Sequence, residues 1–245
     1  MTTREGTPLL MRGTEHSVSR GIGDWANLLA FGAVQWPWLI KSLYGGRKAD
    51  RRALLAKLNL AADALPHLGS WKADVGLLEL IVDSILQRQP QQVVELGAGA
   101  STLVAARALE MAGTGGSLTS FDQHADFVAQ TRTWLASHGL AADLRHAPLR
   151  APSGRWDDLW YSLTAVPDAI DLLLIDGPPW AINPTGRRHA QCLFDRITPG
   201  GMVILDDAAR PGERLVALRW SRDHPDFHWR FVAGIKGILI GVKTA

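Results

Sequence analysis

The chain has 245 residues, with 26 Lys and Arg against 24 Asp and Glu, a formal net charge of +2, and 47% hydrophobic residues. This ordinary globular composition argues against disorder, collagen or a coiled coil as the main architecture. A net charge so close to zero gives no general attraction to nucleic acid. A single cysteine excludes an internal disulfide and a zinc site built from cysteines.

The length suits one large α/β domain with an N-terminal extension, which we divide into residues 1–70 and 71–245. No stretch reaches the roughly 20 consecutive apolar residues that a membrane-spanning helix needs. The polar N-terminus lacks the apolar core of a signal peptide. We therefore expect a cytoplasmic protein.

Two helices are expected in the extension, over residues 24–44 and 47–65. The first is apolar and rich in tryptophan, and the second begins with basic residues. Positive charges dominate between them: Lys41, Arg47, Lys48, Arg51, Arg52 and Lys57 against Asp50. Such a pair of helices can lie on an anionic membrane. It can equally pack on the rest of the chain or form a homodimer contact, so peripheral membrane contact through residues 24–57 and a homodimer both stay open.

After a third predicted helix at 74–88, short apolar runs alternate with helical stretches. Strands are expected at 92–97, 117–122, 142–147, 170–177 and 201–207, and helices at 101–112, 125–139, 184–197 and 212–223. The chain closes with two apolar runs, 227–234 and 236–243, that should form an antiparallel hairpin. The pattern predicts an α/β fold: a Rossmann-like, doubly wound, mostly parallel seven-stranded sheet with a C-terminal antiparallel hairpin and a helical N-terminal extension.

Ligands of such sheets bind where the strands end. The first strand runs into a turn with Gly97 and Gly99, which lets the backbone approach a ligand closely. The next strand ends at Asp122, whose carboxylate can accept both hydroxyls of a ribose. Together they indicate a nucleoside-containing ligand. A dinucleotide fingerprint wants Gly or Ala where this chain has Thr102, which argues mildly against a nicotinamide cofactor.

The ordered motifs ELGAGAST, SFD, IDGPP and the closing hairpin resemble the class I S-adenosylmethionine-dependent methyltransferases over about residues 70–243. Within that superfamily the chain is similar to a methyltransferase-24-like group, with motifs resembling VELGxGxST, HAPL, DGPP and LDDAxRPGE. The resemblance implies that Glu95, Gly97 and Gly99 line the methionine side of the cofactor and that Asp122 holds its ribose. His146 would lie near the adenine, although it can equally be a spacer. The full implied cofactor set is Glu95, Gly97, Ala98, Gly99, Ser101, Thr102, Asp122, Gln123, His146 and Ala147.

Three carboxylates follow the next two strands: Asp176, Asp206 and Asp207. Neighbouring strand ends should bring them together with no obvious Lys or Arg partner. A divalent cation such as Mg²⁺ would relieve their repulsion. The layout resembles the metal-dependent O-methyltransferases, in which the metal would lower the pKa of a substrate hydroxyl. One of the pair at 206 and 207 could instead cap the following helix.

The sequence departs from the catechol-type pattern at two places. That pattern has Asp-Asn where this chain has Asp206-Asp207, and a lysine where this chain has Pro179. The catechol-type lysine base is therefore missing. We expect Asp176 to act in catalysis or substrate positioning. His189 is a candidate base, or else a solvated residue of its helix.

Several aromatic residues have two interpretations. Trp156, Trp160 and Tyr161 can wall an acceptor pocket or pack their segment onto the sheet. Trp180 and Trp71 are expected to overhang the cleft.

The predicted function is methyl transfer from S-adenosylmethionine to a small-molecule or glycan-type acceptor, most simply an oxygen nucleophile, with a divalent metal as an optional cofactor. The alternatives are a nicotinamide-dependent oxidoreductase, and a non-catalytic nucleoside-binding or membrane-docked scaffold with the same fold. Nucleic acid is not favoured as the acceptor because no extended basic face with interleaved aromatic residues follows residue 57.

Overall fold

The computed structural model describes residues 18–65, 68–69 and 72–244. Three helices come first: α1 (Ile22–Ser42), α2 (Lys48–Lys57) and α3 (Val75–Arg88). Strands and helices then alternate through β1 (Gln92–Leu96), α4 (Ala100–Ala112), β2 (Ser117–Asp122), α5 (Ala125–Ser137) and β3 (Asp143–His146). The second half contains β6 (Ile170–Ile175), η2 (Gly186–Arg196), β7 (Ile197–Leu205), α6 (Pro211–Asp223), β8 (Phe227–Val232) and β9 (Ile238–Lys243).

A single seven-stranded sheet has the order β3-β2-β1-β6-β7-β9-β8. The five strands from β3 to β7 pair in parallel, and β9 pairs antiparallel with both β7 and β8. The predicted Rossmann-like sheet and its closing hairpin are confirmed. The order reverses between β1 and β6, and ligands of open α/β sheets bind at such a switch point.

Alternating side chains of each parallel strand build two separate cores, one on each face of the sheet. Val93 of β1 packs with α3, α4 and α5, whereas Val94 packs with η2 and α6. Leu172 and Leu173 of β6 divide in the same way. Burial on both faces is the physical reason why these strands are continuously apolar.

Local signals set the ends of the helices. The side chain of Asp74 accepts a 2.9 Å hydrogen bond from the amide of Leu77 and so caps α3. Helix α4 ends at Gly113, which adopts a left-handed conformation. Helix α6 begins with Pro211 at its first position, where the missing amide hydrogen costs nothing.

The structure corrects two predicted elements and adds others. The helix expected at 47–65 ends at Lys57, and Asn59 adopts a positive φ of 49° that breaks the helical path. The helix expected at 184–197 is a segment of 3₁₀ type, η2. The segment 151–169 contains a short helix η1 (Trp156–Asp158), and a small second sheet pairs β4 (Leu149–Arg150) with β5 (Trp160–Tyr161).

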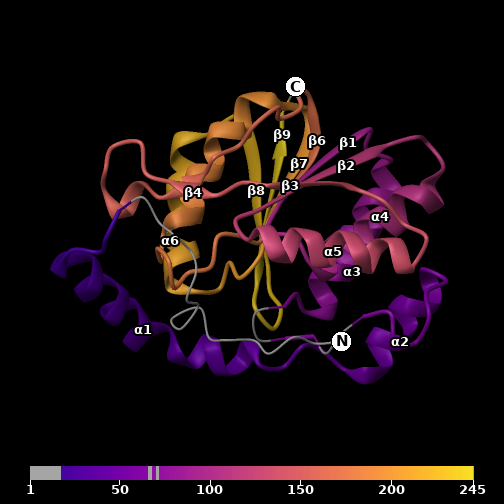
Figure 1. The fold of residues 1–245 in the computed structure, drawn as a ribbon, viewed down its shortest axis with the longest axis horizontal. Coiled ribbons are helices and arrows are strands. Elements are labelled where there is room, and N and C mark those ends of the chain that lie inside the picture. The colour runs from indigo at the N-terminus through magenta and orange to yellow at the C-terminus, as the bar shows by residue number, and fades with distance from the viewer. Residues whose placement is uncertain (1–17, 66–67, 70–71, 245) are drawn as a thin grey trace.

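The N-terminal extension packs on the rest of the chain. Leu54, Leu55 and Leu58 of α2 are buried in the core that also holds α3 and α4. Helix α1 runs along the edge at which the parallel strands end, opposite the C-terminus of the chain (Figure 1). Among the helices of the described ranges, none is long and apolar enough to cross a membrane. The tail before residue 18 lies outside the described residues.

Candidate active site

The turn after β1 packs directly against the turn after β6. Gly97 has a positive φ of 100°. A Cβ added there would lie 2.9 Å from the backbone nitrogen of Gly177. Only glycine satisfies both the conformation and the close approach. The backbone conformation and the close approach therefore explain why glycine stands at position 97 of the Gly-x-Gly turn.

Beneath this turn lies a buried network around Glu95. The hydroxyls of Thr102 and Ser120 donate to the same carboxylate oxygen of Glu95, at 2.6 Å and 2.5 Å. Thr102 also accepts the amide of Gly99 at 2.8 Å and thereby holds the start of α4. Burial raises the pKa of the Glu95 carboxyl. Its other oxygen has no hydrogen-bond partner among the described residues. The hydrogen bonds of Glu95 and Thr102 thus hold the turn of Gly97 and Gly99 in its conformation.

Asp122 closes the other side of the turn, at the end of β2. Its carboxylate accepts the amides of Ala98 at 3.2 Å and His124 at 2.8 Å. Burial raises its pKa to about 7. These contacts aim the carboxylate across the loop of Gly97 and Gly99, where a ribose would lie in a nucleotide-binding βαβ unit.

The remaining predicted cofactor residues gather at the same edge. His146 ends β3 directly beside Asp122, and its Nε2 lies 3.1 Å from the backbone oxygen of Gln123. Gln123, Ala147 and Ser101 are buried. The structure therefore places the predicted set around the ends of β1, β2 and β3.

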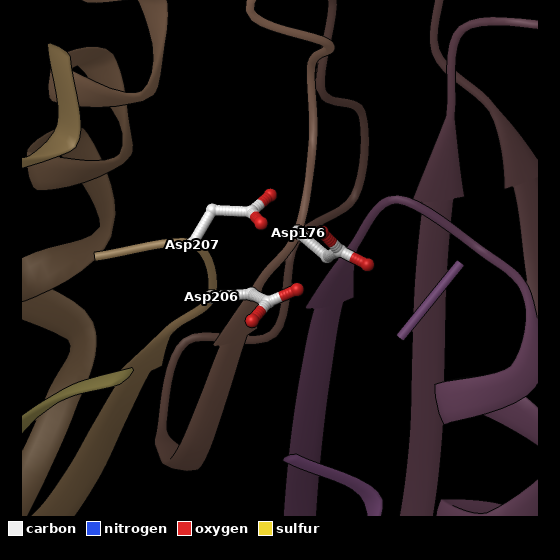
Figure 2. A group of neighbouring side chains, drawn as sticks. All are labelled: Asp176, Asp206 and Asp207. Carbon is white, nitrogen blue, oxygen red and sulfur yellow. The ribbon is translucent and has the colours of Figure 1, made fainter. Parts of the chain in front are cut away.

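The three predicted acids converge at the ends of β6 and β7 (Figure 2). One carboxylate oxygen from each of Asp176, Asp206 and Asp207 lies within 4.8 Å of the others. Asp206 and Asp207 are almost fully buried, whereas the side chain of Asp176 is 20% exposed. Asp176 is therefore the most exposed member of the trio.

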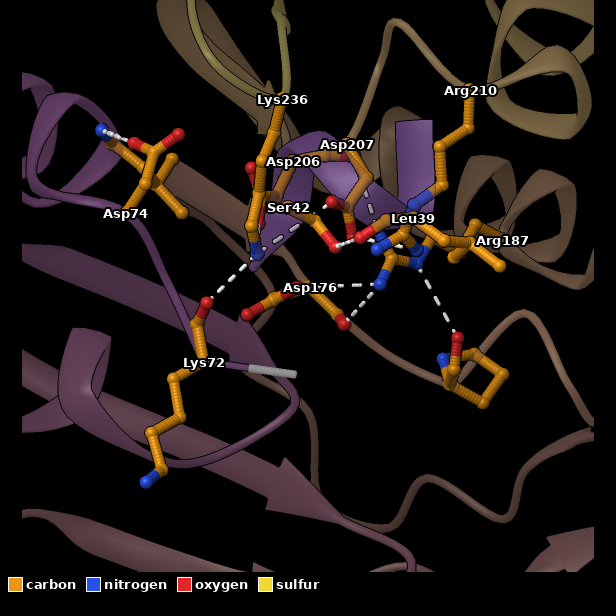
Figure 3. A network of polar contacts seen from close by, with 12 residues as sticks. Leu39, Ser42, Lys72, Asp74, Asp176, Arg187, Asp206, Asp207, Arg210 and Lys236 are labelled. Carbon is orange, nitrogen blue, oxygen red and sulfur yellow. Dashed lines mark hydrogen bonds and ion pairs between the residues drawn. The ribbon is translucent and has the colours of Figure 1, made fainter. Parts of the chain in front are cut away.

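The premise that these acids lack a basic partner is wrong. Arg187 of η2 lies 3.3 Å from Asp176 and 3.4 Å from Asp207. Arg210 lies 2.9 Å from Asp207. The ammonium of Lys236, from the turn between β8 and β9, lies 3.6 Å from both Asp206 and Asp207 (Figure 3).

The charges of this network act unequally on the three acids. Burial and the neighbouring Asp206 raise the pKa of Asp176 well above its usual range. Burial and the adjacent Asp207 raise the pKa of Asp206 to about 6. Burial also acts on Asp207, but Arg210, Lys236 and Arg187 outweigh it and lower that pKa. The surroundings thus favour the ionised form of Asp207 and disfavour the ionised form of Asp176.

Arg187 ties the two strand ends together through their backbone. Its guanidinium donates to the carbonyl oxygens of Asp206 at 3.0 Å and Pro178 at 3.3 Å, and also to that of Asp176. Its side chain is only 5% exposed. Five donors in a rigid fork suit this arrangement.

His189 lies apart from the acids. Its Nε2 is 3.1 Å from the backbone oxygen of Asp157, and its ring lies beside Trp160, with 5.8 Å between ring centroids. Burial lowers the pKa of this imidazole. The described contacts hold His189 against the 151–169 segment, and its role as a base stays a prediction.

The aromatic residues pack the site rather than overhang it. Trp156, Trp160 and Tyr161 belong to the core on the η2 and α6 face. Trp180 is only 7% exposed and packs against Leu28 and Leu39 of α1, so the expected overhang is wrong. Trp71 lies outside the described residues.

The hydroxyl of Tyr161 packs closely against Gly177, in the turn that follows β6. A Cβ added at Gly177 would lie only 2.0 Å from its hydroxyl oxygen. This hydroxyl is buried without a hydrogen-bond partner among the described residues. The glycine of the DGPP motif therefore makes room for Tyr161.

Sequence patterns alone missed Arg187, Arg210 and Lys236. Each looks solvated in the sequence, since Arg187 stands in a basic run and Lys236 in a hairpin turn. The one usable signal was indirect: buried acids require compensating cations.

The chain is similar to known proteins both in sequence and in fold. Residues 94–208 match a family model described as a methyltransferase domain. No curated protein matches the chain significantly. The O-methyltransferase TomG from Streptomyces achromogenes, solved in complex with SAM, is 16% identical with a TM-score of 0.52, covering 89% of this chain and 99% of its own.

Two further solved structures are similar. An O-methyltransferase from Bacillus cereus in complex with SAH is 14% identical with a TM-score of 0.53, covering 89% of this chain and all (100%) of its own. The SAH-bound Podospora anserina methyltransferase PaMTH1 is 12% identical with a TM-score of 0.53, covering 94% and 99%. At such identities these likenesses show the fold. Together with the methyltransferase-domain match over residues 94–208, they are consistent with the fold of a class I S-adenosylmethionine-dependent methyltransferase.

Proposed function

We propose that the protein binds S-adenosylmethionine at the ends of β1, β2 and β3 and transfers its methyl group to an oxygen nucleophile of a small-molecule or glycan-type acceptor. The observation that carries this proposal is the placement of Asp122 beside the turn of Gly97 and Gly99. The solved relatives named as O-methyltransferases support the choice of oxygen.

Asp176 is the residue that we propose as the proton acceptor. It is the most exposed of the three acids, and its turn packs on Gly97 of the cofactor loop. Burial raises the pKa of Asp176, so its ionised form takes up a proton more readily than an ordinary aspartate does. As the acceptor oxygen attacks the methyl carbon, the C–O bond forms and the C–S bond breaks. The hydroxyl proton passes to Asp176, and the products are a methyl ether and S-adenosylhomocysteine.

One carboxylate oxygen from each of the three acids lies close enough to the others to share a divalent metal, but a buried ammonium already faces two of these acids. The Lys236 ammonium faces the carboxylate oxygens of Asp206 and Asp207 that a metal would need. Because the ammonium lies 3.6 Å from Oδ2 of Asp206 and from Oδ1 of Asp207, it would compete with a metal for these atoms. We therefore propose that Lys236 supplies the positive charge that the sequence suggested for Mg²⁺, and we route no step of the transfer through a metal.

The test combines binding with transfer. Calorimetric titration with S-adenosylhomocysteine should show micromolar binding that Asp122→Ala abolishes. Asp176→Asn should retain that binding but reduce transfer of an isotope-labelled methyl group to a panel of hydroxylated acceptors by about 10²- to 10⁴-fold. Asp168→Asn, a change at a fully exposed carboxylate, is the matched control.

The outcomes separate the alternatives. Failure of wild-type protein to bind S-adenosylhomocysteine, with binding of NADH instead, would support the nicotinamide-dependent oxidoreductase. Cofactor binding with no transfer to any class of acceptor would favour the non-catalytic scaffold. Equal transfer by wild type and Asp176→Asn would remove Asp176 from the role of base.

A further inference from the structure

Helix α1 carries an apolar stripe that faces away from the protein. Its members recur at helical spacing: Ile22, Trp25, Leu29, Ala33, Trp36, Ile40 and Leu43. The six large side chains among them are 46–91% exposed. Surface helices normally present charged or polar residues to water. Contiguous exposed apolar surface of this kind marks a binding face.

The opposite side of α1 is already used. Leu28 and Leu39 pack against Trp180, which follows Asp176 in the chain. Gln35 and Ser42 are buried on the same side. The inner face of α1 therefore packs on the protein, beside the carboxyl ends of the parallel strands (Figure 1). The stripe lies on the opposite, outward face of the helix.

The stripe leads into a basic hollow at the junction of α1 and α2. This hollow has a volume of about 470 Å³, and its lining includes Tyr44, Arg47, Lys48, Arg51, Leu68 and Val75. Arg47 and Lys48 are exposed and stand at the N-terminus of α2. Basic side chains at a helix N-terminus favour an anion such as a phosphate.

We propose that the α1 stripe and this hollow together dock the protein on an anionic membrane surface. The stripe enters the interface between headgroups and acyl chains, and the hollow takes a lipid phosphate. Trp36 suits this depth, because indole rings prefer the interfacial region. Each basic residue near the surface adds electrostatic attraction.

Charge favours the membrane over a second copy of the chain as the occupant. A second copy could cover the apolar stripe, but it would bring the same basic residues to the contact. The single acid of α1, Asp24, already accepts the amide of Gly21 at 2.9 Å. An anionic bilayer would bury the apolar stripe and would also attract the basic hollow.

Cosedimentation with lipid vesicles tests the proposal on the full chain. Wild-type protein should bind vesicles of phosphatidylcholine with phosphatidylglycerol, bind phosphatidylcholine alone weakly, and be released by high salt. Leu29→Glu or Trp36→Glu should weaken binding by about tenfold or more, since each removes one large apolar side chain from the interface. The double variant Arg47→Glu with Lys48→Glu should lose the preference for anionic vesicles.

Met111→Glu is the matched control. Met111 is also an exposed apolar residue, 41% accessible, but it lies near the end of α4 that points away from the cofactor loop. This variant should bind vesicles like wild type. Circular dichroism and thermal unfolding confirm that the variants fold. The proposal is overturned if wild type does not bind anionic vesicles, or if the stripe variants bind them normally. A dimer in light scattering that Trp36→Glu dissociates, without vesicle binding, would assign the stripe to a second copy.

Discussion

The ammonium of Lys236 lies 3.6 Å from Oδ2 of Asp206, and both side chains are almost fully buried. The same ammonium lies 3.6 Å from Asp207 and donates to the backbone oxygen of Lys72 at 2.8 Å. It thus connects the closing hairpin, the end of β7 and the segment before α3 (Figure 3). The Lys236 ammonium thus balances the charge of the two acids and also holds these three segments together.

Lys236→Met should therefore create a metal response that the wild type lacks. We expect the variant to be destabilised by about 3–5 kcal/mol, because it removes the ion-pair partner of the buried Asp206 carboxylate. Mg²⁺ or Mn²⁺ should restore part of this loss, measured as a rise in melting temperature. Lys243→Met is the control, since Lys243 lies on the same hairpin and donates to the backbone oxygen of Phe194. Strong Mg²⁺ binding by the wild-type protein, measured calorimetrically, would contradict the proposed role of Lys236.

Arg187 and Arg188 are neighbours in the chain with different environments, and they form a matched pair for stability measurements. Arg187→Met removes the cation that joins Asp176 and Asp207, so we expect a loss of about 3–5 kcal/mol in urea unfolding. Arg188 donates to Thr185 and to the backbone oxygen of Asp157, and Arg188→Met should cost only about 1 kcal/mol. Equal losses would show that the buried ion pairs of Arg187 stabilise the protein no more than the hydrogen bonds of Arg188 do.

Gly177→Ala should disturb the site through Tyr161. The added methyl would lie 2.0 Å from the tyrosine hydroxyl oxygen, and overpacking of this kind costs about 1–3 kcal/mol. Adding Tyr161→Phe removes the nearest atom and should recover part of the loss. A double-mutant cycle on unfolding free energies and on S-adenosylhomocysteine affinity measures the coupling. Additive effects of the two changes would rule out the contact as the cause.

Cofactor binding should depend on pH through Asp122, whose pKa burial raises to about 7. The ionised carboxylate is the better acceptor for ribose hydroxyls. Affinity for S-adenosylhomocysteine should therefore rise with pH through about 7 and level off above it, weakening by up to about tenfold per pH unit below.

The same shift affects stability with the opposite sign. The folded state holds the Asp122 proton more tightly than the unfolded state, so ionisation destabilises the fold progressively between the ordinary aspartate pKa and about pH 7. Calorimetry across this pH range, with Asp122→Asn as the control, separates Asp122 from the nearby His124 and His146. An unchanged pH profile in the variant would assign the dependence to another group.

The sheet, the Gly-x-Gly turn and the meeting of the three acids could be predicted from the amino-acid sequence. These features follow from local rules: apolar runs of strand length, a Gly-x-Gly turn at Gly97 and Gly99, and acids directly after buried strands. Because parallel strands end at one edge, the position of Asp176 and Asp206 in the chain was enough to predict their proximity.

Tertiary structure alone decided which charges balance those acids and which surfaces stay exposed. Arg187 and Lys236 come from a 3₁₀ segment and a hairpin turn that are distant in the chain, and no local periodicity encodes a contact through space. The exposed face of α1 could not be predicted either, because apolar residues stand on all sides of this helix. Packing of Leu28 against Trp180 selects its inner face, and the stripe from Ile22 to Leu43 is what remains outside.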